Sequence, residues 1–159
     1  MTPLITTLLV GAAVFGLDFF SKQAVMARMT VGDSVPVIPH LLYITYTRNP
    51  GAAYGLLSGN RWLLATIALA AVLGALYASM KLKRLDERIA LGLLVAGAAG
   101  NLVDRMRTGL VTDFIEIRPL RWVFQIFNVA DLAITTAVVI ALLTAVFWQR
   151  ERGAPADRK

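Results

Sequence analysis

Four apolar segments separated by polar links organise the chain. They cover residues 4–27, 62–80, 88–104 and 129–148. A membrane-spanning helix needs about 20 mainly apolar residues, or as few as about 17. The third segment reaches that length only when the charged residues at its ends are included. Its small residues would let it approach neighbouring helices closely: Gly92, Gly97, Ala98 and Gly100. The pattern predicts a bundle of four transmembrane helices.

The two longer links, residues 28–61 and 105–128, have the composition of strands rather than of irregular loops. They contain runs of β-branched and aromatic residues that predict short strands at residues 35–39, 41–47, 114–117 and 122–127. A hairpin around Arg118–Arg121 would join the last two strands and bring the start of the fourth helix close to Asp113. The expected fold class is therefore an all-α membrane bundle of four transmembrane helices with a small β-rich extracytoplasmic element.

Composition supports a membrane protein and narrows its chemistry. Hydrophobic residues make up 57% of the chain, above the roughly 45–50% of soluble domains. The chain has no cysteine and a single histidine, His40, which we expect in a loop. Disulfides, iron–sulfur clusters and the common zinc motifs are therefore excluded, and we expect neither a metal nor another cofactor.

Basic residues predict the orientation of the bundle. Four of them lie between Lys81 and Arg88, and four more follow Trp148. Such clusters favour the cytoplasmic side, which explains the net charge of +6 without nucleic acid and places both termini inside. We expect one domain at residues 1–150 and a flexible cytoplasmic tail at residues 151–159. The first segment lacks a basic start and contains Asp18 and Lys22, so we expect a retained anchor rather than a cleaved signal peptide.

Polar residues outside the basic clusters converge on the outer end of this predicted bundle. Carboxylates at a membrane boundary are costly and indicate a functional site. Asp113 precedes the last apolar segment, and Asp131 lies in its first turn. Two carboxylates that meet could share one proton and activate a water molecule.

Structural explanations and other functions remain open for these residues. Asp18 and Lys22 are spaced i,i+4 and could neutralise each other; Asn128 could cap a helix. A transporter would place polar groups near the midplane of the bilayer and often has repeated halves. A serine protease would need Ser58 with Lys22 as the only intramembrane base.

Five motifs, in order, resemble the lipoprotein signal peptidase family, also called signal peptidase II, whose members are bacterial membrane aspartic proteases. They are Asp18–Lys22, Asn49–Gly55, Gly100–Arg105, Gly109–Phe114 and Phe127–Asp131. The likeness spans nearly the whole chain. Phe19 and Tyr54 depart from the pattern, where the family often has Gln and usually has Phe, respectively.

The resemblance implies a role for each polar position. Asp113 and Asp131 would be the catalytic pair. Residues lining the substrate and inhibitor pocket would be Asn49, Gly51, Asn101, Arg105 and Asn128, and residues supporting the fold would be Asp18, Lys22 and Asp104.

The resemblance also implies the reaction and its setting. The family removes the signal peptide of prolipoproteins on the N-terminal side of a diacylglyceryl-modified cysteine, and globomycin-type cyclic peptides inhibit it. The expected protein is a monomer of the bacterial cytoplasmic (inner) membrane, in contact with phospholipid. Its active site would lie at the outer leaflet boundary.

Overall fold

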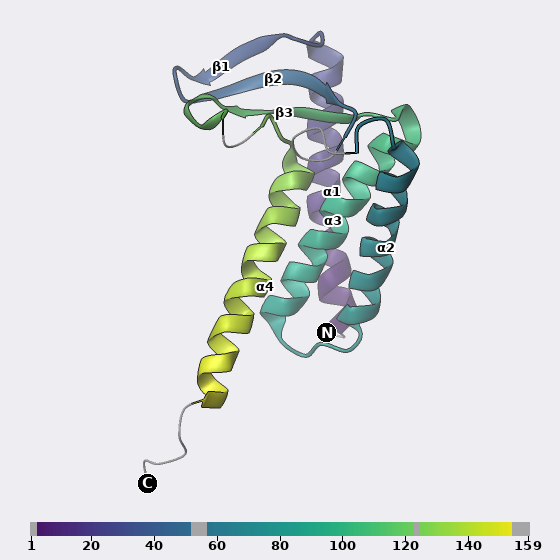
Figure 1. The fold of residues 1–159 in the computed structure, drawn as a ribbon, viewed down its shortest axis with the longest axis vertical. Helices are drawn as coiled ribbons and strands as arrows, with labels where there is room; N and C mark the ends of the chain where they lie inside the picture. Colours follow the sequence, from purple (N-terminus) through teal and green to yellow (C-terminus); the bar gives the residue numbers. More distant parts are fainter. Residues whose placement is uncertain (1–2, 52–56, 123–124, 154–159) are drawn as a thin grey trace.

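The computed structural model describes residues 3–51, 57–122 and 125–153. Tyr54 and the end of the predicted tail lie outside these ranges. Four helices dominate the fold: α1 (Pro3–Arg28), α2 (Arg61–Ser79), α3 (Leu85–Thr108) and α4 (Val129–Gly153). Each contains a stretch long and apolar enough to cross a membrane. Figure 1 shows them as a bundle with the three strands at one end.

Two helices extend beyond the segments predicted from hydropathy. α3 begins at Leu85 and continues through Arg105 and Arg107 to Thr108, where Gly109 ends it in the left-handed conformation, with φ of 80°. Charged residues at both ends of this helix shortened its hydropathy signal. α4 continues to Gly153, three residues into the segment that we expected to be a flexible tail.

α3 is the central helix, packed against each of the other three. Its glycines explain how the helices come so close. A Cβ atom on Gly92 would lie 2.8 Å from Cβ of Val10 in α1, and one on Gly97 would collide with the carbonyl oxygen of Ala130 in α4. These contacts confirm the predicted role of the small residues as close-packing surfaces.

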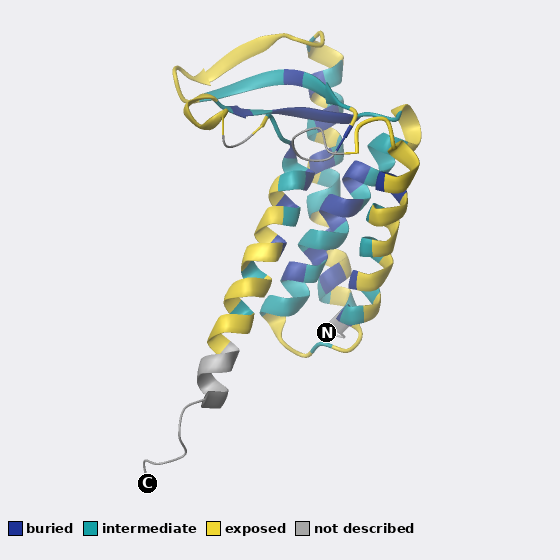
Figure 2. Cartoon of the chain, viewed as in Figure 1, coloured by how far each residue is buried: buried dark blue, intermediate teal, exposed yellow. Residues whose placement is uncertain are grey.

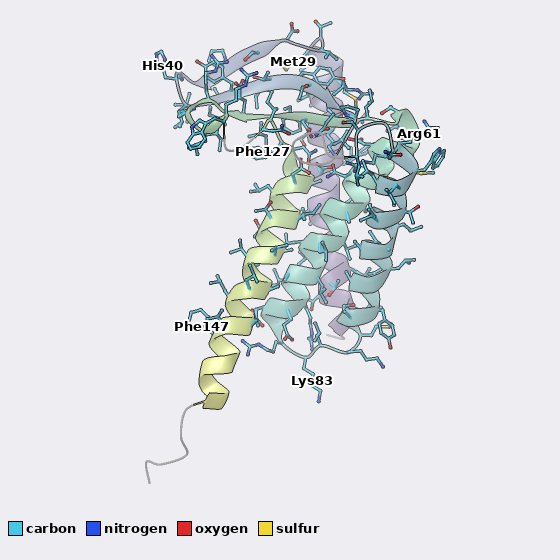
Figure 3. All side chains as sticks on the ribbon, viewed as in Figure 1. Met29, His40, Arg61, Lys83, Phe127 and Phe147 are labelled. Atoms are coloured by element: carbon cyan, nitrogen blue, oxygen red, sulfur yellow. The ribbon has the colours of Figure 1, made fainter. Side chains whose placement is uncertain are left out.

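Large apolar side chains cover the outward faces of the bundle. Leu73 of α2 and Leu142 and Phe147 of α4 are more than half exposed, and Figure 2 shows exposed residues along these outer faces. In Figure 3, Phe147 points away from the other helices. Exposed apolar surface around a bundle of this length is the expected contact with lipid.

The three strands form one antiparallel sheet in the order β1–β2–β3, with bounds Ser34–Ile38, Leu42–Asn49 and Val111–Ile117. The register pairs Thr47 with Asp113 and Arg48 with Thr112. His40 lies in the turn between β1 and β2 with φ of 65°. A small core of Val25, Tyr46 and Phe114 fastens the sheet to α1.

The chain returns from the sheet to α4 as predicted, but the described residues of the strand predicted at residues 122–127 form no strand, and residues 123 and 124 lie outside the described ranges. A short 3-10 helix, η2 (Arg118–Leu120), carries the chain away from the sheet edge. In the described part of that segment, only Phe127 pairs with β3, through two backbone hydrogen bonds with Ile115. Because α4 begins two residues later, this single bridge sets the distance between Asp113 and the first turn of α4. Figure 3 shows Phe127 at this junction.

Candidate active site

A buried ion cluster joins α1 to α3 below the sheet. Nζ of Lys22 lies 2.8 Å from Oδ2 of Asp18 and 3.2 Å from Oδ2 of Asp104. The same ammonium donates to Oδ1 of Asn101 at 3.2 Å. Three acceptors therefore use the three N–H donors of Lys22. The predicted pairing of Asp18 with Lys22 is confirmed, and Asp104 also belongs to this cluster.

The first turn of α4 is held by side chains from two helices. Asn128 accepts a hydrogen bond from the backbone N–H of Asp131 at 2.9 Å, and its own backbone N–H donates to Oδ2 of Asp131 at 3.2 Å. This reciprocal pair has the geometry of a capping box. Oδ1 of Asp18 accepts the backbone N–H of Ala130 at 2.8 Å. A carboxylate of α1 therefore satisfies a donor that the start of α4 would otherwise bury unpaired.

Asp113 lies on β3 with both carboxyl oxygens hydrogen-bonded. Nδ2 of Asn128 donates to its Oδ1 at 2.6 Å, and Nδ2 of Asn49 donates to its Oδ2 at 3.0 Å. The side chain is almost completely buried. Burial and the nearby negative charge of Asp131 raise its pKa to about 7, although the two amide hydrogen bonds act in the opposite direction.

Asp131 occupies a different environment from Asp113. Its Oδ1 accepts Nδ2 of Asn101 at 2.8 Å, its backbone position is in the first turn of α4, and it is partly exposed. Negative charge at a helix N-terminus is favourable. Asn128 contacts both aspartates, so one amide side chain links the two carboxyl groups.

Arg105 ties the first outer link to α3. Its Nη2 donates to the carbonyl oxygen of Gly51 at 2.9 Å, and its Nη1 donates to the carbonyl of Asn101 at 3.3 Å. The backbone N–H of Gly51 in turn donates to Oδ1 of Asn49 at 2.9 Å. This chain of bonds places the amide of Asn49 against Asp113.

All the site residues expected from the sequence meet in one connected network. Every member is joined to the rest through at least one hydrogen bond or ion pair: Asp18, Lys22, Asn49, Gly51, Asn101, Asp104, Arg105, Asp113, Asn128 and Asp131. Among the described residues, no cluster of His, Cys, Asp and Glu has the composition of a metal site.

Two further members of this network were not predicted. Thr112 is fully buried; its backbone N–H donates to Asp104 at 3.0 Å, and its hydroxyl accepts Nη1 of Arg48 at 2.9 Å. Arg48 and Thr112 are register partners on β2 and β3. The signal for this pair is the strand register, which the sequence pattern alone does not provide.

An open cavity of about 410 Å³ lies beside Asp113. Its lining comes from the end of β2, from the link after it and from the segment that precedes α4. The lining residues are Thr47, Arg48, Asn49, Pro50, Ser58, Asp113, Arg121, Gln125 and Ile126. A peptide could therefore approach the buried carboxyl group of Asp113 from outside the bundle.

A family model described as signal peptidase (SPase) II matches residues 10–147. The chain belongs to the signal peptidase II family. A lipoprotein signal peptidase of Staphylococcus carnosus is 40% identical over 147 residues, covering 91% of this chain and 92% of that protein. One of Brevibacillus brevis is 38% identical over 137 residues, covering 85% and 91%.

Solved structures agree with this membership. A bacterial membrane enzyme with 35% identity superimposes with a TM-score of 0.86, covering 97% of this chain and 94% of that one. A second, 37% identical, gives a TM-score of 0.81 and covers 88% and 92%. This signal peptidase II chain is therefore a multi-pass bacterial membrane protein and a peptidase, and the predicted fold class is confirmed.

Proposed function

We propose that the protein is a membrane aspartic endopeptidase that removes signal peptides from prolipoproteins, cleaving on the N-terminal side of the diacylglyceryl-modified cysteine. The observation that carries this proposal is the pair Asp113 and Asp131, linked through Asn128 at the end of a membrane bundle. Membership of the signal peptidase II family supports the substrate class.

The two aspartates take different roles in this mechanism. Asp113, whose pKa is about 7, carries the proton, and Asp131 is the ionised base. A water molecule between them loses a proton to Asp131 as its oxygen attacks the scissile carbonyl carbon. Asp113 donates its proton to the developing oxyanion. As the tetrahedral intermediate collapses and the C–N bond breaks, one of its hydroxyl protons returns to Asp113 to leave the carboxyl product, and the proton held by Asp131 passes to the leaving amine of the cysteine.

The surrounding amides position these groups and the substrate. The side-chain amide of Asn101 donates to Oδ1 of Asp131, and that of Asn49 donates to Oδ2 of Asp113. Arg105 bonds to the carbonyl of Gly51 and keeps the link beside Asn49 in place. Globomycin-type cyclic peptides would occupy the same pocket by presenting their backbone to these groups.

The bilayer determines how the lipid-modified part of the substrate meets the protein. The link at residues 80–84, the start of α1 and the end of α4 lie at the end of the bundle away from the sheet (Figure 1). The positive-inside rule places that end in the cytoplasm, so Asp113 faces the outer leaflet boundary. The acyl chains of the substrate lie in the membrane beside the bundle, each buried CH₂ contributing about 0.8 kcal/mol. A single copy of the chain holds the whole network, so a monomer suffices.

The serine protease alternative is disfavoured by the position of its base. Nζ of Lys22 is bonded to Asp18, Asn101 and Asp104, so all its donors are used within the ion cluster. The transporter alternative is disfavoured because the polar network gathers at one end of the bundle rather than at its midplane.

The test compares a diacylglyceryl-cysteine precursor peptide with its unlipidated twin, using purified protein in lipid. We expect cleavage of the lipidated peptide alone, with turnover abolished in Asp113→Asn and Asp131→Asn. Ser58→Ala is the control and should retain near-normal turnover. A variant at Asp113 or Asp131 with a near-normal rate would refute the two-aspartate mechanism, whereas absence of cleavage by folded wild type would refute the proposed function.

A further inference from the structure

Arg121 lies in the wall of the cavity that contains Asp113. It follows η2 and lines the same cavity as Asn49 and Asp113. Its side chain is 66% exposed, so its guanidinium is accessible to a molecule entering the cavity. Nothing in the five sequence motifs marks this residue, and the mechanism does not use it.

A buried carboxylate holds Arg121 at this position. The side chain of Glu116 on β3 is only 2% exposed, and its Oε1 lies 3.5 Å from Nη1 of Arg121. That Oε1 has no hydrogen-bond partner among the described residues. Its Oε2 accepts the hydroxyl of Thr45 and Nη2 of Arg118. Oε2 of Glu116 is therefore held by hydrogen bonds from Thr45 and Arg118, while Oε1 faces Arg121.

Glu116 is held in its charged form. Burial by itself would raise its pKa, but hydrogen bonds from Thr45 and Arg118 and the charges of Arg118 and Arg121 more than offset this effect, so its pKa lies below the ordinary value. A buried ion pair is weak evidence for stability, because apolar residues of similar size often stabilise a fold as well or better. We therefore attribute to Glu116 the positioning of the exposed guanidinium of Arg121 rather than a contribution to stability.

The other arginines near the cavity are occupied differently. Arg48 also lines the cavity, but its Nη1 contacts Thr112 and Met26. The guanidinium of Arg118 stacks 3.3 Å from the ring centre of Tyr43, and Arg118 is outside the cavity lining. Arg121 is thus the cation best placed to meet a charge on the substrate.

The position of the cavity indicates which part of a substrate would pass Arg121. The cavity is lined by the end of β2, the link after it, Asp113 and the segment before α4, and all of these elements lie at the sheet end of the bundle (Figure 1). A signal peptide would stay with the helices in the membrane. The segment that follows the lipid-modified cysteine would leave through the sheet side, because it belongs to the part of the substrate outside the membrane.

We propose that Arg121, positioned by Glu116, is a specificity residue that favours substrates with an acidic side chain in the first few residues after the lipid-modified cysteine. This inference rests on the proposed function. A partly exposed ion pair strengthens an interaction only modestly, and a mispaired like charge adds to the difference. Replacement of an acidic by a basic residue should therefore lower kcat/KM by about threefold to tenfold.

The experiment measures kcat/KM for two lipidated peptides that differ only in Asp or Lys at the second position after the cysteine. Wild type should prefer Asp, with the preference shrinking as salt is raised. Arg121→Gln should remove the preference, and Arg121→Glu should reverse it. Glu116→Gln should reduce the preference while leaving kcat for an uncharged peptide nearly unchanged, as expected of a positioning residue.

Arg107→Gln is the matched control. It removes the same charge from the same end of the bundle, but Arg107 sits over the ring of Phe19 rather than in the cavity lining. The preference should survive in this variant. Equal cleavage of both peptides by wild type, or a preference that persists in Arg121→Gln, would overturn the role of Arg121 and leave the proposed function standing. Failure to cleave any lipidated peptide would instead overturn the proposed function.

Discussion

The two ends of the helical bundle are held together in different ways. At the sheet end, buried charged and amide side chains connect α1, α3 and α4, with Lys22 and Asn101 at the centre of the network. At the opposite end, single hydrogen bonds join neighbouring helices, such as Thr7 to the carbonyl of Arg88 and Thr144 to Asp86. Between the two ends, Gly92 and Gly97 bring the helices together by shape alone.

This contrast distinguishes the interactions that associate the helices from those that position the proposed active site. Close packing of small residues and occasional hydrogen bonds suffice for helix association in a bilayer. Buried ionisable groups in a membrane are expensive, so a dense network of them needs another reason. Here the network fixes the two aspartates of the proposed active site, and it does so from three helices and the sheet.

The largest effect is expected from removing the central charge of the polar end. Lys22→Met would leave the buried Asp18 and the partly buried Asp104 without their cation. Breaking a buried ion pair by removing one partner costs about 3–5 kcal/mol. Thermal unfolding in detergent should show that the free energy of unfolding falls by this amount. Part of the lost stability should return in the double variant Lys22→Met/Asp18→Asn.

Lys81→Met provides the comparison from the other end. Lys81 lies 5.7 Å from the ring centre of Tyr77 and is exposed, so its loss should change stability by no more than about 0.5 kcal/mol. Similar losses in the two variants would show that the polar end has no special role in stability.

A second large effect should come from Asn128, which caps α4 and contacts both aspartates. Asn128→Ala should lower kcat/KM by at least about a hundredfold, because losing about 2.7 kcal/mol of transition-state stabilisation has that effect. Cleavage of a lipidated peptide provides the measurement. Asn60→Ala is the control, since Asn60 precedes α2 without a side-chain cap bond; comparable losses in both would contradict the role given to Asn128.

The parts of the fold that the sequence predicted are those imposed by the bilayer and by local chemistry. A span must be long and apolar, and this located all four helices. The ends of α3 were missed because Asp86 and Arg107 lower the hydropathy there, although the backbone hydrogen bonds continue to Gly109. A helix can extend into the interface with charged side chains, so hydropathy underestimates its length.

The site was predictable only where its residues carry motifs or share a helix face. Asp18 and Lys22 meet because of their i,i+4 spacing, and the return of the chain brought Asn128 to Asp113. The contact between Arg48 and Thr112 depends on the register of β2 against β3, which contains a bulge. Register in a short sheet is a tertiary property, so the sequence pattern did not reveal this contact.

A moderate effect should come from the close-packed middle of the bundle. Gly97→Ala places a methyl group against the carbonyl of Ala130 and the side chain of Ile134. Forcing extra volume into a packed interface typically costs about 1–3 kcal/mol. Gly74→Ala is its control, because a Cβ there meets nothing within 4 Å. Unfolding measurements should show destabilisation only at Gly97, and equal behaviour of the two variants would contradict tight packing at α3.

The smallest effect concerns the proton on Asp113, whose pKa is about 7. If this proton is needed for catalysis, kcat/KM should fall as pH rises through about 7. The hydrogen bond from Asn49 stabilises the charged carboxylate and so lowers this pKa. Asn49→Leu removes that bond, so the protonated form should persist to higher pH. The alkaline half-maximum should therefore move upward by up to about one unit.

The direction of this shift is informative even if Asn49→Leu also lowers the absolute rate. A substrate-binding role alone would reduce kcat/KM equally at every pH, whereas control of Asp113 moves the half-maximum. Asp33→Asn removes an exposed carboxylate that bonds to Thr30 at the sheet end, and it should leave the half-maximum in place. A downward shift in Asn49→Leu, or no shift, would contradict the assignment of the alkaline limb to the proton on Asp113.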